Sequence, residues 1–426
     1  MGLRETMRDE QARSLLAGAP AAGLLHGAVN VVENGHRWCR PLRLSEDQLR
    51  ALGSCQAWHP GLFRQMARTT AGICVEFETD ACEIALEVRV DAEPKGTRAV
   101  LDYVDRANPD GPQPHDGISA DVDGRHLWCG MPAQRDELLV LSLEGADPTD
   151  ALGLQPLPGM ARARHVRIWL PALRGCEVRD VVCDGTFVRP VGHRRHLLVL
   201  GDSIAQGFVA GDPALSWPAQ LAMRQGLDLV NQGIGGQVFQ PGSLYGLAGV
   251  IDPERIVVAY GENYRYEACM ARRVSRDVRS YLLEVARLWP QVKTHVLTPL
   301  WHDEVAYPSH GMSCHEQVPS IIAANTAPHD QMTLIDGLEL MEHDPELFAD
   351  GFEHPNERGC RQIAMRLNTV MRVPGLRPSS VGKRRKPKGS GKAKTRRTTS
   401  AKPDTTGVDL RASEPDTLQL PLDGLL

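Results

Sequence analysis

The sequence lacks a long apolar run, a cysteine pair in CxxC spacing and an internal repeat of fixed period. A helix that crosses a bilayer needs about 20 consecutive apolar residues, so no membrane association is expected. The first residues, MGLRETMRDEQARSLLAGAPAAG, place acids before any short apolar patch, which argues against a secretory signal. These absences together predict a cytoplasmic protein. Its ten cysteines are spread singly and are expected to be reduced thiols, with ordered disulfides as the alternative if the chain is exported.

The chain is too long for one compact domain. It has 426 residues, whereas a single core usually stops growing at roughly 250 to 300 residues. Its 42% hydrophobic and 24% charged residues are ordinary for a soluble globular protein. We predict a partly helical N-terminal segment at 1–22, a β-sandwich domain at 23–190, an α/β domain at 191–373 and a tail at 374–426.

The predicted tail is strongly basic. Lys383 to Lys402 holds ten basic residues, no acid and almost no large apolar residue. Such a segment cannot bury enough apolar surface to offset its ordering entropy, so we expect it to be disordered. A plain solvated extension and a segment that contacts nucleic acid or an acidic surface are both compatible with this composition.

The N-terminal half contains short alternating runs separated by turn residues. In 74–79, Cys74, Glu76 and Glu78 alternate with Val75, Phe77 and Thr79, which is the period of a strand with one buried face. The run AVLDYVDRANPDGP at 99–112 is among the strand candidates, and only 47–52 and the first twenty residues look helical. Strands at this spacing predict an antiparallel sandwich or jelly roll.

After His196 the pattern changes to apolar strands that alternate with amphipathic helices. The expected strands are HLLVL, DLVN, RIVVAY, THVLT and TLID, and the expected helices span 218–225, 274–288, 318–324 and 358–371. This alternation predicts a parallel sheet that is covered by helices on both faces. Ligands of such sheets bind beyond the carboxyl ends of the strands, so the residues that follow each strand are the candidates for chemistry.

Five of these residues supply the parts of an acyl-transfer site. Each has a plain structural explanation when taken alone, as a helix cap, a turn residue or a surface imidazole. Ser203 is a nucleophile once a base takes its proton, and the pKa of His354 suits that base. The N–H groups of Ser203 and Gly236 and the amide of Asn263 can stabilise an oxyanion. Asp350 can hold the imidazole in the correct tautomer.

The motifs GDSIAQG, NQGIGG, GEN and HPNERG resemble, in order, the sequence blocks of the SGNH or GDSL-type hydrolases. The resemblance covers His196 to about Met371. It implies a three-layer flavodoxin-like domain and ester hydrolysis through an acyl-serine intermediate. The N-terminal half also resembles the β-rich domain that precedes the catalytic domain in some bacterial esterases of this family, including certain carbohydrate esterases. This implies a small acyl ester as substrate, such as an acetyl ester on a sugar.

The sequence departs from the family pattern in two blocks. The third block reads GENY where many members have Gly-x-Asn-Asp, but Asn263 is intact. The fifth block usually has an aspartate three residues before the histidine, where this chain has Gly351; Asp350 lies four residues before. The group that orients His354 is therefore Asp350, with Glu353 or a backbone carbonyl as alternatives.

The loop LTPLWHDEVAYPSHGMSCHE contains several metal-capable side chains, but their spacing fits no regular zinc pattern. No metal and no cofactor are predicted. Trp301 and His302, which follow a strand, and Tyr264, which follows Asn263, are candidates to line the substrate pocket; a packing role for Tyr264 is an equal alternative. The rival functions are a noncatalytic carbohydrate-binding protein and a nucleic-acid-associated factor that acts through the tail. The sequence makes no prediction about oligomeric state.

Overall fold

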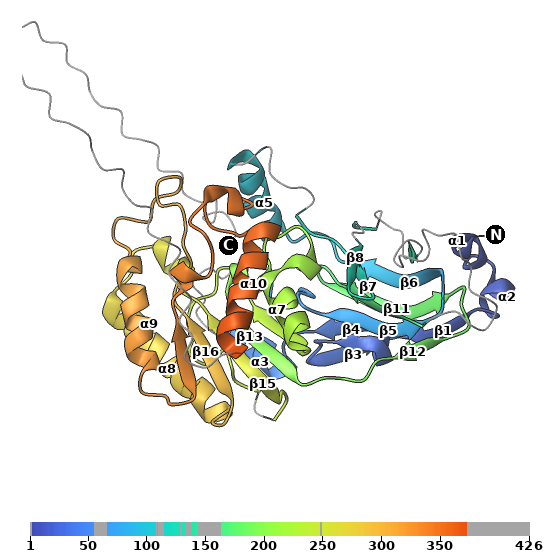
Figure 1. The fold of residues 1–426 in the computed structure, drawn as a ribbon, viewed down its shortest axis with the longest axis horizontal. Coiled ribbons are helices and arrows are strands. Elements are labelled where there is room, and N and C mark those ends of the chain that lie inside the picture. Colours follow the sequence, from blue (N-terminus) through green and yellow to red (C-terminus); the bar gives the residue numbers. More distant parts are fainter. Residues whose placement is uncertain are drawn as a thin grey trace, which may run out of the picture.

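The computed structural model describes residues 2–54, 66–107, 109, 115–127, 130–132, 138–143, 163–247 and 249–372. A β-rich half and an α/β half lie side by side along the long axis of the molecule (Figure 1). The predicted basic tail lies outside the described residues. None of the described helices is long and apolar enough to cross a membrane.

Two antiparallel sheets form the N-terminal half. The first has the order β3 (Asn30–Asn34), β4 (Trp38–Leu42), β11 (Cys176–Cys183), β6 (Glu83–Val90) and β9 (Leu138–Ser142), with β1 (Ala17–Pro20) beside β11. The second has the order β12 (Val188–Pro190), β5 (Cys74–Thr79), β10 (Arg164–Trp169), β7 (Ser119–Val122) and β8 (Arg125–Leu127), with β2 (Leu25–His26) beside β5. Buried side chains from both sheets share one core, which includes Phe77, Leu86, Ile168 and Val181. The half is thus an antiparallel β-sandwich, as predicted.

Three local predictions in this half were wrong. Residues 99–107 belong to helix α5 (Lys95–Ala107), because Leu101 and Val104 lie on one helical face and are buried together in a core cluster. The end of the supposedly helical first twenty residues is strand β1, which follows the short helices α1 (Leu3–Thr6) and α2 (Glu10–Arg13). Strand β5 was predicted to have one buried face, but it is buried on both. Its Glu76 is 0% exposed, because it lies where the sandwich meets the α/β half and pairs there with Arg167.

A five-stranded parallel sheet forms the core of the α/β half. Its order is β14 (Asp228–Gly233), β13 (His196–Gly201), β15 (Pro253–Ala259), β16 (Lys293–Leu297) and β17 (Met332–Ile335). One face is covered by α6 (Ser203–Gln206), α7 (Trp217–Gln225) and α10 (Glu357–Arg372), and the other by α8 (Ala271–Leu288) and α9 (Val318–Thr326). All five strands and four helices lie where the apolar pattern predicted them. The strand order 2-1-3-4-5 is flavodoxin-like, and its switch point lies beside β13.

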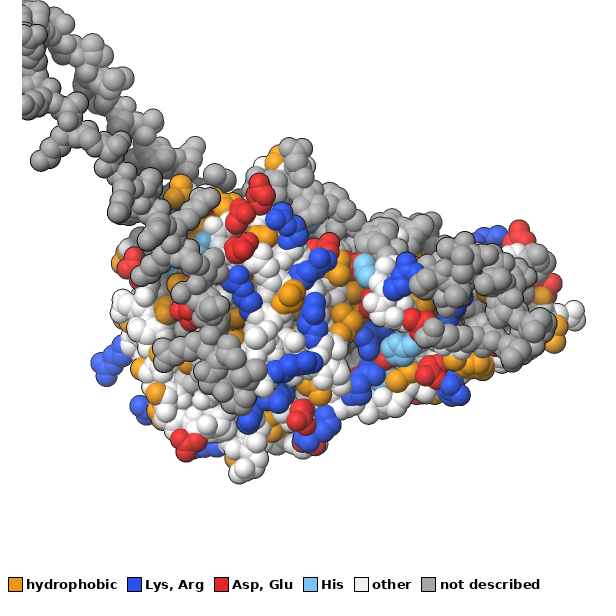
Figure 2. All heavy atoms as spheres, viewed as in Figure 1, with side chains coloured by type: hydrophobic (Ala, Val, Ile, Leu, Met, Phe, Trp, Pro, Cys, Tyr) orange, Lys and Arg blue, Asp and Glu red, His pale blue; other side chains and the backbone are white. Residues whose placement is uncertain are grey.

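The outer surface of the α/β half is polar in the view of Figure 2. Arginine side chains lie over α7 and α10, whereas hydrophobic side chains are scattered. Helix α10 buries Ile363, Leu367 and Met371 against the sheet. The helices therefore follow the expected amphipathic pattern. Because they cover both faces of the sheet, a polar site is expected at the carboxyl ends of the strands.

Candidate active site

Ser203 lies immediately beyond β13, at the start of α6. The cap of this helix is Asp202, whose side chain accepts a hydrogen bond from the N–H of Ile204 at 3.1 Å. Ser203 is the first helical residue, so capping does not account for its hydroxyl.

A hydrogen-bonded chain links Ser203, His354 and Asp350. The Oγ of Ser203 lies 2.8 Å from Nε2 of His354, and Nδ1 of His354 lies 2.6 Å from Oδ2 of Asp350. A carboxylate only accepts hydrogen bonds, so in the neutral imidazole Nδ1 carries the proton and Nε2 accepts from the serine. This is the geometry in which a histidine can take the serine proton.

The loop from Asp350 to His354 accommodates the extra residue by turning tightly. Gly351 has φ +83°, and Oδ1 of Asp350 accepts the N–H groups of Phe352, Glu353 and His354 at 3.0, 2.9 and 3.1 Å. The carboxylate thereby holds both the backbone and the ring of His354. The side chain of Glu353, the alternative candidate, lies instead 3.8 Å from the guanidinium of Arg265.

The carboxylates around the imidazole determine its protonation. Burial acts to lower the pKa of His354, but the charge and hydrogen bond of Asp350 outweigh it, and the pKa rises to about 9. Burial acts to raise the pKa of Asp350, but His354 and the backbone N–H groups hold it below its usual value. Burial and the carboxylates of Glu262 and Glu353 raise the pKa of Asp202 well above its usual range. At neutral pH, Asp350 and His354 therefore carry opposite charges.

Three donors are available for an oxyanion. The N–H of Ser203 opens a helix and has no partner within it. Gly236 follows β14 with φ +76°, and no hydrogen bond among the described residues uses its N–H. Asn263 lies in the short helix η4 (Glu262–Arg265), where Nδ2 donates to the carbonyl of Gln237 at 3.0 Å and keeps its second N–H. These donors come from the ends of three adjacent strands, β13, β14 and β15.

Buried polar side chains, which the sequence reasoning missed, support the Gly236 loop. Arg43 from the sandwich half is 0% exposed and donates to the carbonyls of Asn231, at 3.1 Å, and Gly233. Gln206 of α6 accepts the N–H of Gly235 at 2.9 Å and donates to the carbonyl of Ala172 at 2.8 Å. Isolated polar residues in a sequence carry no periodic signal, so only the tertiary contacts identify them.

An apolar cluster joins the sandwich half to the same loops. It contains Leu44, Leu52, Met66, Leu101, Val104 and Leu173 from the N-terminal half, and Phe208, Val209, Ile234 and Ala349 from the α/β half. The Phe208 ring lies 5.2 Å from that of His354. The β-rich half therefore contacts the loops that carry the candidate site.

The three predicted pocket residues lie in different surroundings. Tyr264 is 1% exposed within the core beside α8, which favours the packing alternative over a place in a substrate pocket. Trp301 is partly exposed and stacks between His343 and Phe348, with ring centroids 5.3 and 5.5 Å away. His302 points toward Glu262, and its Nε2 lies 2.8 Å from Glu304.

In two clusters of described residues, the side chains place potential metal-ligand atoms close together. One consists of His26, His193 and Asp228, and the other of Glu262, His302 and His315. In the first, Asp228 is already paired with Arg194 at 2.8 Å. The second lies beside Asn263 and is considered further below.

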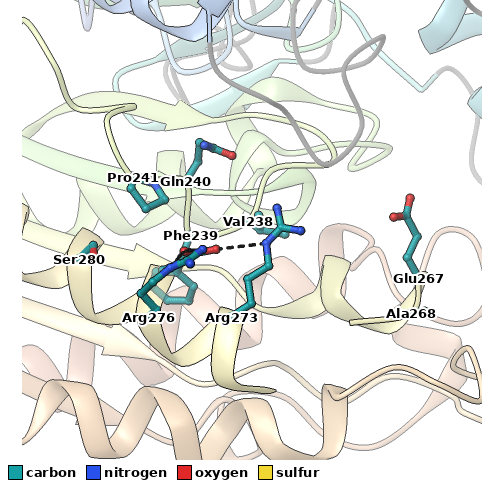
Figure 3. A pocket seen from close by; sticks show the side chains of 10 residues that line it. Val238, Phe239, Gln240, Pro241, Glu267, Ala268, Arg273, Arg276 and Ser280 are labelled. Carbon is teal, nitrogen blue, oxygen red and sulfur yellow. Dashed lines mark hydrogen bonds and ion pairs between the residues drawn. The ribbon is translucent and has the colours of Figure 1, made fainter. Parts of the chain in front are cut away.

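A surface hollow of about 480 Å³ lies beyond the Gly236 loop (Figure 3). It is lined by residues 238–241, by Glu267 and Ala268, and by α8, where Arg273 and Arg276 flank Asp277. Neither Ser203 nor His354 lines it. This hollow is thus separate from the hydrogen-bonded chain.

Residues 199–362 match the sequence profile of the GDSL-like lipase/acylhydrolase family. No curated protein sequence matches the chain. Solved structures with a similar fold include the salicylyl-acyltransferase SsfX3 from a tetracycline biosynthetic pathway, with 15% identity, a TM-score of 0.61 and coverage of 83% of this chain and 94% of that one. A family two carbohydrate esterase from Cellvibrio japonicus has 11% identity, a TM-score of 0.53 and coverage of 83% and 96%. An acetyl xylan esterase from Butyrivibrio proteoclasticus has 11% identity, a TM-score of 0.50 and coverage of 84% and 98%. Matches of this extent include both halves of the chain.

Proposed function

We propose, from the GDSL-like lipase/acylhydrolase domain at residues 199–362, that this protein is a serine esterase that cleaves short acyl esters, acetyl esters foremost. The observation that carries the proposal is the continuous chain from Ser203 Oγ through His354 to Asp350, with hydrogen bonds of 2.8 and 2.6 Å. A nucleophile, a base and an orienting carboxylate in this order are the parts that acyl transfer requires.

In the first step, Ser203 attacks the ester carbonyl while Nε2 of His354 takes the hydroxyl proton. Negative charge develops on the carbonyl oxygen, where the N–H groups of Ser203, Gly236 and Asn263 stabilise it. Asp350 stabilises the imidazolium that forms. The tetrahedral intermediate then expels the alcohol, which receives its proton from His354, and the acyl group remains on Ser203.

The second step repeats the chemistry with water. His354 takes a proton from a water molecule, which attacks the acyl-serine carbonyl, and the same donors stabilise the second oxyanion. Collapse of this intermediate returns the proton to Ser203 and releases the carboxylic acid. Apart from the ester and the water molecule, both steps use only groups of this chain.

An O-acetylated carbohydrate is the proposed substrate class. Support comes from the fold, because a β-sandwich packed on the α/β domain is shared with a family two carbohydrate esterase and an acetyl xylan esterase. The sandwich half contacts the loops around His354 through Phe208 and Ala349, so it lies where it can shape the rim of the site.

Acyl transfer to an alcohol is the second candidate. The structure with a TM-score of 0.61 is a salicylyl-acyltransferase, and the acyl-serine intermediate is common to both reactions. The two outcomes differ only in whether water or an alcohol attacks it. Product analysis with and without an added alcohol acceptor separates them.

The test is hydrolysis of a panel of aryl acetates and O-acetylated sugars by the full chain and by Ser203→Ala. We expect serine-dependent turnover, with kcat of the variant reduced by about 10⁴-fold or more. The exposed Ser280→Ala on α8 is the matched control and should retain full activity. If wild type shows no serine-dependent turnover and no serine-reactive phosphonate labels it, the enzyme proposal fails and the noncatalytic carbohydrate-binding alternative takes its place.

A further inference from the structure

We propose that Glu262, His302 and His315 form a binding site for a divalent transition-metal ion, Zn²⁺ foremost, because their ligand atoms all lie within 4.8 Å of one another. The proposal is independent of the esterase activity. It assigns a role to residues that the serine mechanism does not use.

The three ligands are brought together by the fold and not by sequence spacing. Glu262 begins η4 directly after β15, His302 lies in the loop after β16, and His315 begins η5 (His315–Gln317). All three segments emerge at the carboxyl edge of the parallel sheet. The three ligands therefore form no short motif of regular spacing. The sequence analysis predicted no metal because it found no such motif.

The facing atoms of the cluster have unmet hydrogen-bonding capacity. Glu262 is 4% exposed, and neither of its carboxylate oxygens has a hydrogen-bond partner among the described residues. The same holds, within those residues, for Nδ1 of His302 and Nε2 of His315. Burial of an ionised carboxylate without hydrogen bonds is costly unless a cation compensates it.

His302 is oriented as a metal ligand. Its Nε2 lies 2.8 Å from Glu304, so the Nε2 proton is donated to that carboxylate and the lone pair of Nδ1 faces Glu262. A lone pair directed at a carboxylate is unfavourable without a cation between them. Metal-binding histidines commonly donate their other N–H to a carboxylate in this way.

The spacing of the ligand atoms fits a tetrahedral ion. Oε2 of Glu262 lies 3.4 Å from Nε2 of His315 and 3.8 Å from Nδ1 of His302. The ligand atoms of the two histidines lie within 4.8 Å of each other. Ligands about 2.0–2.1 Å from Zn²⁺ in a tetrahedron are about 3.3 Å apart, so the side chains must move together to complete the site. The two histidine side chains are 13% and 11% exposed, which leaves access for a fourth ligand such as water.

The surrounding charges favour a cation. Glu262 and Glu304 are acidic, and the carboxylate of Glu262 helps to raise the pKa values of both Asp202 and Glu353. Among the described residues, Arg265 is a cation nearby; its guanidinium lies 3.7 and 3.8 Å from Glu304 and Glu353, and its charge also helps to lower the pKa values of Glu262 and His302. A bound ion would join η4 to the two loops and so hold the segment that carries Asn263.

The experiment is titration of the full chain, freed of metal by a chelator, with Zn²⁺ by calorimetry. We expect one saturable site per chain, and Co²⁺ should give the visible absorption of a tetrahedral complex. Glu262→Gln and His315→Ala should each lower the affinity by at least about 10-fold. His310→Ala, in the same loop and exposed, is the matched control and should bind as wild type does. Ser203→Ala should also bind normally, which separates this proposal from the esterase.

Cysteine thiols are the competing ligands. Sγ of Cys269 lies 2.7 Å from Sγ of Cys314, which directly precedes His315. Zn²⁺ binding by a Cys269→Ser/Cys314→Ser variant should be retained. The proposal is overturned if wild type shows no saturable site, if Glu262→Gln and His315→Ala bind as tightly as His310→Ala, or if only the cysteine variant loses the ion. Circular dichroism of each variant excludes loss of fold as the cause, and His302→Ala replaces any variant that does not fold.

Discussion

At the scale of single residues, the environment of His354 predicts the pH dependence of the reaction. The proposed base acts only when its imidazole is neutral, and the raised pKa of about 9 means that the neutral fraction grows as the pH increases from neutral toward 9. We therefore expect kcat/KM for an aryl acetate to rise through this range, rather than to level off near pH 7. A pH–rate profile with a plateau below pH 7 would contradict the assignment.

Asp350→Asn should change both the rate and the position of that profile. The amide cannot stabilise the imidazolium or select the Nδ1–H tautomer, so kcat should fall by about 10⁴-fold. Loss of the negative charge should also lower the pKa of His354, so the rise of the remaining activity should move to lower pH. Glu353→Gln is the comparison, because Glu353 is not hydrogen-bonded to the ring and should leave most of the activity in place.

At the scale of elements, Arg43 connects the sandwich to the end of β14. No carboxylate among the described residues pairs with it, and burial lowers its pKa to about 9. Arg43→Met leaves the carbonyls of Asn231 and Gly233 without their donor, which should reduce the free energy of unfolding by about 2–4 kcal/mol. The Gly236 loop should also loosen, so kcat should fall by about 10–100-fold with little change in KM.

The control for Arg43 is Arg40→Met, measured by denaturant unfolding and steady-state kinetics in parallel. Arg40 is partly exposed, lies on β4 and donates to Asp91 at 2.6 Å and to Glu177 at 3.1 Å, not to the carbonyls of β14. Arg40→Met should reduce the free energy of unfolding by no more than about 1 kcal/mol. Equal effects of the two substitutions on kcat would show that Arg43 does not position the loop.

The close packing of β14 on α6 gives a second prediction at this scale. A Cβ added at Gly233 would lie 2.4 Å from the N of Gln206 and 2.9 Å from the carbonyl oxygen of Asp202. These are backbone atoms at the start of the helix that carries Ser203, so Gly233→Ala should destabilise the protein by about 1–3 kcal/mol and lower kcat. A Cβ at Gly192 would meet nothing within 4 Å, so thermal unfolding of Gly192→Ala should match wild type.

At the scale of the whole molecule, the described residues between 2 and 372 contain all three sheets, all candidate site residues and the interface between the halves. Deletion of 376–426 should therefore leave ester hydrolysis unchanged and abolish any salt-sensitive binding to DNA. Kinetic constants and DNA binding at two salt concentrations check this. Loss of esterase activity on deletion would contradict the domain boundary, and salt-sensitive DNA binding that depends on the tail would support the nucleic-acid hypothesis.

Much of this architecture could be predicted from the sequence, because it depends on local patterns. The β-branched runs of β13 to β17 and the apolar faces of α8 and α10 have clear periods, and they lie where the sequence indicated. Helix α5 was missed because Leu101, Asp102 and Tyr103 alternate as in a strand, whereas the helical spacing of Leu101 and Val104 spans a single turn. Ser203 and Asn263 were identified as candidates because they follow predicted strands, and His354 because it lies in the loop before the last predicted helix.

The sequence by itself determined the parallel sheet, the order of its strands along the chain and the identity of the residues at their ends, since these follow from hydrophobic period and short motifs. Only the tertiary structure decided which of those residues meet. It brings Asp350 to His354 through a turn at Gly351, inserts Arg43 behind β14, buries Tyr264 and gathers Glu262, His302 and His315. The reason is physical: such contacts depend on loop conformation and on segments distant along the chain, which leave no periodic trace in the sequence.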